Sequence, residues 1–332
     1  MNHKTGTVCR CYSGRANANF SLLPDCSYLH ADERVRRWKE RFHSIVLVAL
    51  VATGCLLGST AYAGPAGGDV AAGSANIVQT TPKRTDIIQQ SNRAVINWQR
   101  FNIKVDEHVN FQQPTSKSAT LNRVKGPEVS NILGRLTANG NVFLINPNGI
   151  LFGKSAKIDV AGLLASTTNI KNDKFMAGRY EFDQVMGRGG RIVNHGEISV
   201  AEGGLVAFVA PGVENHGVIK ARLGRVALAS GNKFTLDLYG DQLVSLAVDD
   251  SVVEQMTDTE GKPAKALVEQ SGEIEADGGE VLLTASAARS VVDNVINMSG
   301  VIRARSVVEQ NGEIVLLGGD EGGVRVAGQL DA

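Results

Sequence analysis

Two Asn-His-Gly tripeptides are the most obvious candidates for a metal site in this sequence. His195 and His216 lie 21 residues apart, each preceded by Asn and followed by Gly. Imidazole binds zinc and related ions, but a protein site normally needs further Cys, His, Asp or Glu ligands at a fixed spacing. The sequence around the pair offers no such set. We therefore expect a repeated turn that stacks one histidine on the other, with no metal and no other cofactor.

Three further segments resemble catalytic or phosphate-binding motifs only in part. Residues 149–155 (GILFGKS) have one residue fewer between the glycines than a phosphate loop requires. Asp249 and Asp250 are adjacent, and adjacent strand residues point to opposite faces, so they do not form an acid/base couple. Residues 187–191 (GRGGR) read as a flexible basic turn. We expect no enzyme, and a formal net charge of +0 does not indicate a nucleic-acid partner.

The N-terminus has the three regions of a secretory signal peptide. A basic cluster at 34–41 precedes an apolar run at 45–57, and the small residues Ala61 and Ala63 follow in a cleavage pattern. This order predicts entry into the Sec translocon and cleavage after Ala63. The apolar run is short for a membrane span, which makes a permanent anchor the weaker reading. A lipoprotein signal at Cys55 is a second alternative.

The cysteines support an exported chain that is held together without disulfides. All four lie in the first 55 residues, at Cys9, Cys11, Cys26 and Cys55, so cleavage after Ala63 leaves none. The core and the backbone hydrogen bonds must then supply the stability. A chain without covalent loops also remains threadable through a narrow pore.

The second half of the sequence repeats a short unit, Gly-x-Ile-x-Val/Ala. Copies begin at Gly196, Gly217, Gly272 and Gly300, and Gly312 begins a looser copy. A second glycine follows seven or eight residues later, and in most copies a new alternating apolar stretch comes after it. These second glycines are Gly204, Gly224, Gly279 and Gly319.

Such repeats predict a β-solenoid, in which short strands bury one face only by stacking on the next coil. We expect positive φ at the repeated glycines and ladders of Asn between coils. Residues 232–266 interrupt the spacing and predict an excursion from the coil. Because no polar cap precedes Ala332, we expect the sequence to be part of a longer protein. An antiparallel β-sandwich is the alternative, although two-residue hairpin turns are missing.

Residues 76–170 carry a resemblance to a known family. The densest part is Asn146-Pro147-Asn148-Gly149-Ile150, followed by Phe152-Gly153 and by Gly162-Leu163-Leu164-Ala165-Ser166-Thr167. This stretch resembles the secretion domain of filamentous haemagglutinins and high-molecular-weight adhesins, which are exported by two-partner secretion. A companion Asn-Pro-Asn-Leu motif found in some members is absent, so the subfamily stays open. As a local structure, the five-residue motif predicts a rigid turn between two strands.

The resemblance implies an all-β fold: a right-handed parallel β-helix with an N-terminal cap and short extra-helical β excursions. It implies a signal peptide at 1–63, a secretion domain at 64–190 with the motif Asn146–Ile150, and further β-helix repeats at 191–332. The implied partner is an outer-membrane transporter, a barrel with periplasmic docking domains. The implied location is the cell surface or the medium, reached through the periplasm and outer membrane.

These features favour the N-terminal secretion module of a large adhesin-like exoprotein. The host or bacterial surface receptor is unknown. One alternative is the N-terminal part of a contact-dependent growth-inhibition toxin. Another is a β-helix carbohydrate-active enzyme, which would need clustered carboxylates or arginines on one face. We find no such cluster in the sequence.

Overall fold

Apolar residues at alternate positions build the strands, and equivalent positions of successive repeats lie side by side. Ile158, Ile198, Ile219, Ile274 and Ile302 occupy five neighbouring strands, paired in parallel and in register. All five are at most 2% exposed. Because strand side chains alternate between two faces, this register places the apolar residues of every repeat in one shared interior.

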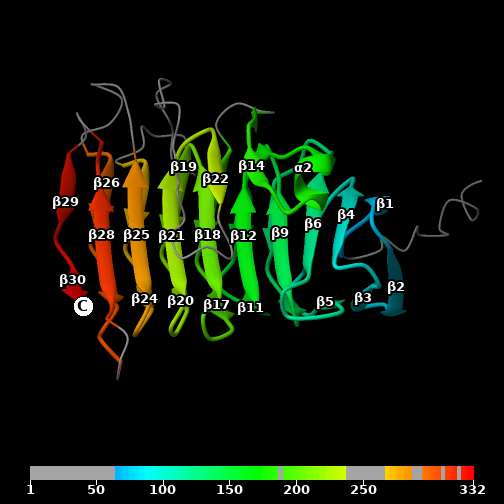
Figure 1. Cartoon of the computed structure of the whole chain (residues 1–332), viewed down its shortest axis with the longest axis horizontal. Coiled ribbons are helices and arrows are strands. Elements are labelled where there is room, and N and C mark those ends of the chain that lie inside the picture. The colour runs from blue at the N-terminus through cyan, green and yellow to red at the C-terminus, as the bar shows by residue number, and fades with distance from the viewer. Residues whose placement is uncertain (1–63, 186–189, 237–265, 286–293, 308–310, 320–322) are drawn as a thin grey trace, which may run out of the picture. The chain divides into compact units, whose positions relative to one another are not determined.

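The structure is a computed structural model that describes residues 64–185, 190–236, 266–285, 294–307, 311–319 and 323–332. The predicted signal peptide with Ala61 and Ala63 lies outside these residues. The same holds for Asp249 and Asp250 and for residues 187–189. The strands of the large sheets follow one another along the stack in chain order (Figure 1).

Three large sheets run along the stack. The nine-stranded sheet has the order β1 (Asp69–Ala72), β4 (Arg93–Trp98), β6 (Ala119–Val124), β9 (Asn141–Ile145), β12 (Gly162–Ser166), β18 (Leu205–Ala210), β21 (Arg225–Ser230), β25 (Glu280–Ala285), β28 (Glu313–Leu317). The ten-stranded sheet has the order β2 (Ala75–Thr81), β3 (Arg84–Gln89), β5 (His108–Gln112), β8 (Arg135–Ala138), β11 (Lys157–Val160), β17 (Glu197–Val200), β20 (Val218–Lys220), β24 (Glu273–Glu275), β27 (Val301–Arg303), β30 (Gln329–Asp331). The seven-stranded sheet has the order β29 (Val324–Val326), β26 (Ile296–Met298), β23 (Val268–Gln270), β19 (Gly212–Asn215), β16 (Arg191–Asn194), β10 (Ile150–Phe152), β7 (Ser130–Ile132).

From β7 to β28, each coil contributes one strand to each of the three sheets, whereas the earlier coils contribute strands only to the nine- and ten-stranded sheets. Strands β10, β11 and β12 follow one another in the chain, and β16, β17 and β18 pair with them in parallel one coil later. The chain therefore forms a parallel β-helix, as predicted, and the antiparallel sandwich is excluded. The three sheets continue without a break across residue 190.

Antiparallel pairs cap the N-terminal end of the stack. Strand β1 pairs with β4 and β2 pairs with β3, both antiparallel, whereas all other described pairs within the three large sheets are parallel. The hairpin β2–β3 closes one end of the ten-stranded sheet. The predicted cap is therefore present.

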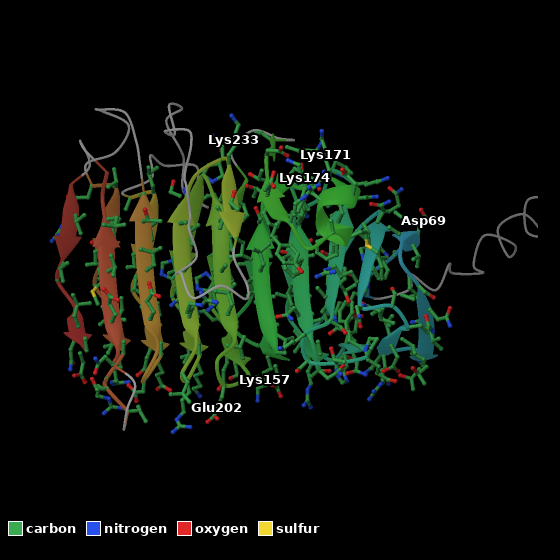
Figure 2. All side chains as sticks on the ribbon, in the orientation of Figure 1. Asp69, Lys157, Lys171, Lys174, Glu202 and Lys233 are labelled. Atoms are coloured by element: carbon green, nitrogen blue, oxygen red, sulfur yellow. The ribbon has the colours of Figure 1, made fainter. Side chains whose placement is uncertain are left out.

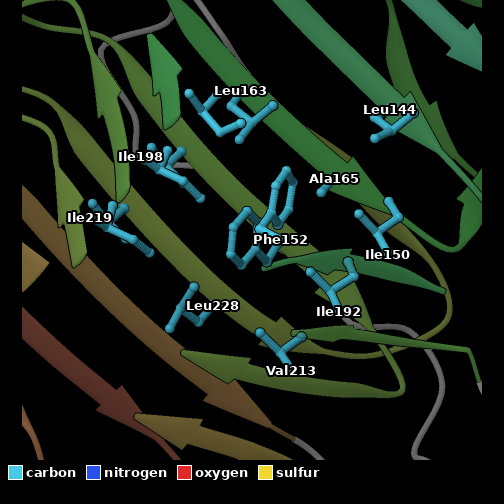
Figure 3. Packing of buried hydrophobic residues seen from close by; sticks show 14 of the residues in the cluster. Leu144, Ile150, Phe152, Leu163, Ala165, Ile192, Ile198, Val213, Ile219 and Leu228 are labelled. Atoms are coloured by element: carbon cyan, nitrogen blue, oxygen red, sulfur yellow. The ribbon is translucent and has the colours of Figure 1, made fainter. Parts of the chain in front are cut away.

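The interior is a continuous column of apolar side chains. Phe152 and Phe208 stack with ring centroids 5.6 Å apart, and Ile198, Ile219 and Leu228 belong to the same buried cluster (Figure 3). No single coil encloses this column, because each contributes only a few inward residues. Stacking of neighbouring coils therefore provides the burial that stabilises the fold.

Asn and Gln side chains form the predicted ladder between coils. Asn194 donates from its side-chain amide to Asn215 Oδ1 at 2.8 Å, and Asn215 donates in turn to Gln270 Oε1 at 2.8 Å. All three residues are fully buried. Each amide satisfies the next, so the ladder crosses three coils without a lone buried polar group.

Gly319, a second glycine of the repeat, has the predicted positive φ, at 68°, but the reason we predicted for the first glycines is wrong. Gly196, Gly217, Gly272 and Gly300 do not have positive φ. Instead, a Cβ on Gly272 would lie 2.1 Å from the carbonyl oxygen of Gly217. Since real Cβ atoms do not approach carbonyl oxygens so closely, the close contact between coils selects glycine at these corners.

The assignment of the looser copy at Gly312 is also wrong. Residues 313–317 form β28, which pairs with β25 and so continues the nine-stranded sheet. The next member of the Gly-x-Ile column is β30, which pairs with β27. An added Cβ on Gly328 would meet the carbonyl oxygen of Gly300 at 2.0 Å, the same contact as in earlier coils.

Two segments leave the coil and meet on the outer face of the nine-stranded sheet. Residues 167–185 contain β13 (Thr168–Asn169), α2 (Asn172–Met176), β14 (Tyr180–Phe182) and β15 (Gln184–Val185). Strand β22 (Phe234–Leu236) pairs antiparallel with β14. Only the start of the predicted excursion at 232–266 is described, and β22 lies outside the three large sheets as expected. The excursion at 167–185 was not predicted.

Membrane-spanning helices are not found in the described part of the chain. None of its helices has the length and apolar character that a crossing requires.

Candidate functional site: the Asn146–Ile150 turn

The motif Asn146–Ile150 forms the predicted turn between two strands. It connects β9 to β10, and the backbone N–H of Gly149 donates to the carbonyl oxygen of Asn146 at 3.0 Å. Gly149 has φ of 112°, which side-chain-bearing residues rarely adopt. Pro147 fixes φ in the middle of the turn. Glycine and proline are therefore both needed for this backbone shape.

The Asn146 side chain holds the turn in place and is fully buried. Its amide donates to the carbonyl oxygen of Glu128 at 2.9 Å and to Ser130 Oγ at 3.0 Å. Its Oδ1 accepts from the Asn148 backbone N–H at 3.0 Å. Asn146 thus ties the turn to the preceding coil and closes the turn itself.

Only the middle of the turn reaches the surface. Asn148 is exposed and Pro147 is half-buried, whereas Gly149 and Ile150 are buried. The Asn148 side chain donates to the carbonyl oxygen of Gly126 at 2.9 Å. A partner that contacts the folded turn would therefore contact Pro147 and Asn148.

The two histidines stack, as expected from their spacing. Their ring centroids are 4.9 Å apart with an interplanar angle of 17°. His216 bonds to Glu214 Oε2 at 3.0 Å and to Ser271 Oγ at 2.5 Å, so both of its ring nitrogens are occupied. Within the described residues, no group of three or more potential ligands is arranged to hold a metal ion. The pair is a stacked corner of the coil.

Charge and burial shift the pKa values of the two histidines in opposite directions. The hydrogen bond to Glu214 raises the pKa of His216 above its ordinary value. Burial, and then the neighbouring His216, lower the pKa of His195. Glu214 is also ion-paired with Arg191. The corner therefore contains one histidine that favours protonation and one that resists it.

The remaining candidate segments do not form sites in the described residues. Residues 150–152 of the phosphate-loop-like segment form strand β10, which pairs with β7 on one side and β16 on the other. Its backbone N–H groups are thus committed to a sheet and cannot surround a phosphate. Of the basic turn at 187–191, only Gly190 and Arg191 are described.

The sequence did not identify Arg123 as important. This side chain is 7% exposed and donates to Asn169 Oδ1 at 2.7 Å, to Asn97 Oδ1 at 3.1 Å and to the Ile170 carbonyl oxygen at 2.8 Å. Its partners come from distant parts of the chain. No local spacing in the sequence indicates such a contact.

A parallel β-helix with an antiparallel cap and an Asn-Pro-Asn-Gly turn between two of its sheets places the chain among the β-helical domains. The model of the TPS (two-partner secretion) secretion domain matches residues 61–331. The chain therefore belongs to this family of secretion domains. Membership implies recognition by a cognate outer-membrane transporter and secretion to the cell surface.

Similar proteins agree with this assignment. Two heme/hemopexin-binding proteins of Haemophilus influenzae are 32% identical over 265 residues and 33% identical over 266 residues. The alignments cover 77% and 74% of this chain but 27% of each relative, so the chain spans about a quarter of their length. The crystal structure of the HMW1 secretion domain from Haemophilus influenzae matches with a TM-score of 0.66 and 32% identity. That match covers 80% of this chain and 66% of the other.

Proposed function

We propose that the Sec translocon delivers this domain to the periplasm, where a transporter with periplasmic docking domains recognises it and exports it. It then stands at the N-terminus of a large exoprotein that is displayed or released at the cell surface. The TPS match over residues 61–331 is the observation that carries this proposal. The order of basic, apolar and small residues before Ala63 supports the first step.

The turn Asn146–Ile150 is the recognition element in this proposal. Its two closing hydrogen bonds, from Gly149 N–H and Asn148 N–H, both end on Asn146. Because they are local, the turn can form in a chain that has not yet folded into coils. The exposed Asn148 then presents the motif to the transporter.

The N-terminal segment from Asn76 to Asn110 is the second contact in this proposal. It contains β2, the outermost strand of the ten-stranded sheet, which has a partner on one side only. An extended strand of this kind pairs readily with the edge of another sheet. We expect it to add to a sheet of the docking domain before the cap forms.

Export of the full chain tests this proposal. The chain is expressed in Gram-negative cells with and without a candidate outer-membrane transporter of the two-partner class from the same bacterium. Protease treatment of intact cells and analysis of the medium then report where the chain lies. We expect surface-exposed or released protein only when the transporter is present. Equal release without the transporter would contradict the proposal.

Two variants separate recognition from stability. Asn146→Ala removes buried hydrogen bonds and should lower the free energy of unfolding by about 1–3 kcal/mol, and it should also reduce export. Asn148→Ala is exposed and should change stability by less than about 1 kcal/mol, yet still reduce export if the motif is read directly. Normal export of both variants would rule out a recognition role.

The names of the relatives refer to haem and hemopexin, but the shared region is the secretion domain. The likeness therefore supports export and does not identify a ligand for this protein. The adhesin-like reading remains our proposal for the whole exoprotein. Nothing in the described residues favours a toxin or a carbohydrate-active enzyme.

A further inference from the structure

The excursion at 167–185 does not act on its own coil alone. The outer apolar cluster beneath it takes residues from six neighbouring strands of the nine-stranded sheet, β4, β6, β9, β12, β18 and β21. These residues include Val95, Leu121, Phe143, Leu164, Ala207 and Ala227. The excursion therefore packs against coils that are not adjacent to one another in the stack.

Aromatic rings join the excursion to the sheet and to β22. Phe143 of β9 lies 5.3 Å from Phe175 and 5.1 Å from Tyr180, measured between ring centroids. Phe182 stacks on Phe234 at 4.3 Å. Burial of large rings dominates the energetics of such clusters. The contact between β14 and β22 is thus the outermost part of one aromatic assembly.

Arg123 ties the same excursion to the second coil. Its guanidinium is buried and bonds to three neutral oxygen acceptors, two of them on Asn169 and Ile170, which follow it by 46 and 47 residues. Burying a charge is costly unless its hydrogen bonds are made. Until residues 169 and 170 are in place, this side chain lacks those two acceptors.

A second hydrogen bond joins the excursion to a segment much later in the chain. Thr168 Oγ1 donates to the carbonyl oxygen of Asn232 at 2.9 Å, across 64 residues. Lys171 and Lys174 of the excursion lie at the same end of the strands as Lys233, which precedes β22, whereas Lys157 and Glu202 lie at the other end (Figure 2). The excursion and β22 therefore meet on one side of the stack.

We propose that the excursion at 167–185 and strand β22 form a late lock on the first coils. Coils that stack only on their neighbours gain stability as each one is added. Here the outer face of β4, β6 and β9 is covered by the excursion, and the excursion itself is completed only when β22, at residues 234–236, pairs with β14. The early coils thus reach their final stability after this much of the chain is available, which delays stable folding of a chain that is still being exported.

Amide hydrogen exchange on the full chain tests the lock. Phe234→Ala removes the ring that stacks on Phe182, at a site outside the three large sheets. The measured quantity is the exchange rate in β4 and β6 divided by the rate in β24 and β27. A general loss of stability raises both exchange rates by the same factor and therefore leaves this ratio unchanged. The lock predicts that Phe234→Ala raises the ratio at least about tenfold, although β4 and β6 are coils away.

Leu228→Ala is the matched control. Leu228 is fully buried in the inner column, in the strand just before β22. Its loss should raise exchange in the neighbouring strands β18 and β25 and leave the ratio unchanged. If Phe234→Ala unfolds the chain, Phe234→Leu, which retains apolar volume, is measured instead, with a smaller rise expected. A ratio within about twofold of the wild type in the Phe234 variant would overturn the lock.

Discussion

His195 and His216 stack on each other, but their surroundings drive their protonation in opposite directions. The pKa of His216 is raised by its bond to Glu214, whereas burial lowers the pKa of His195. Protonated His216 thus stabilises the fold below its unfolded-state pKa, and this contribution is lost as the pH rises through its folded-state pKa. Protonation of His195 instead costs stability as the pH falls below its unfolded-state pKa.

Replacing His216 separates the two effects. His216→Gln removes the acid-side stabilisation. Its deficit in free energy of unfolding relative to the wild type should therefore be larger at about pH 5 than at about pH 8. His195→Gln should show the opposite trend. Chemical denaturation across this range measures both. Parallel pH curves for the wild type and His216→Gln would contradict the assignment.

Among the elements, the corners between the seven- and ten-stranded sheets require glycine, because neighbouring coils approach each other closely there. An added Cβ on Gly217 would lie 2.2 Å from the Gly196 carbonyl oxygen, and the same contact recurs in each coil up to Gly328. Backbone in the neighbouring coil cannot move away as a flexible side chain can. A substitution here must therefore separate two coils.

Gly272→Ala should lower the free energy of unfolding by about 1–3 kcal/mol, because the methyl group overpacks against the backbone of the previous coil. Gly212→Ala is the control, since the atoms nearest to its added Cβ belong to the Arg191 side chain, at 3.2 Å, and not to backbone. The control should stay within about 0.5 kcal/mol of the wild type. Urea denaturation measures both. Equal losses in the two variants would contradict the close-approach explanation.

The sequence predicts the elements well where a repeat exists and poorly where it does not. Period-two alternation placed Ile198, Ile219 and Ile274 in the core, because each coil meets the same geometry. It misplaced Gly312, since β28 has the same alternation as the Gly-x-Ile unit and only the pairing with β25 distinguishes them.

The excursion at 167–185 could not be predicted either, because its packing depends on residues far away in the sequence. Residues 167–185 have no repeat, and their fit depends on Phe143 and Phe234, which are distant in sequence. Within the candidate site, the turn type follows from Asn, Pro and Gly. The burial of Asn146 instead depends on Glu128 and Ser130 of the preceding coil.

For the molecule as a whole, stability depends on the stacking of coils in register. The strands of successive coils pair in register, so a chain without cysteines after residue 55 builds its core from stacking alone. The register holds across the long gap between β20 and β24, where Lys220 pairs with Glu275. In the proposed function, such a chain passes through the transporter in an extended state and folds outside the cell.

Engineered disulfides test this register most directly. In a chain with its four native cysteines replaced by Ser, Lys220→Cys and Glu275→Cys lie opposite each other on adjacent strands, about 4.8 Å apart. Ser199→Cys with Glu275→Cys is the control, because these positions are two strands apart and beyond bridging distance. We predict that the first pair forms a disulfide on mild oxidation and the second does not. A bridge in the control pair, or none in the Lys220–Glu275 pair, would contradict the stacked-coil account.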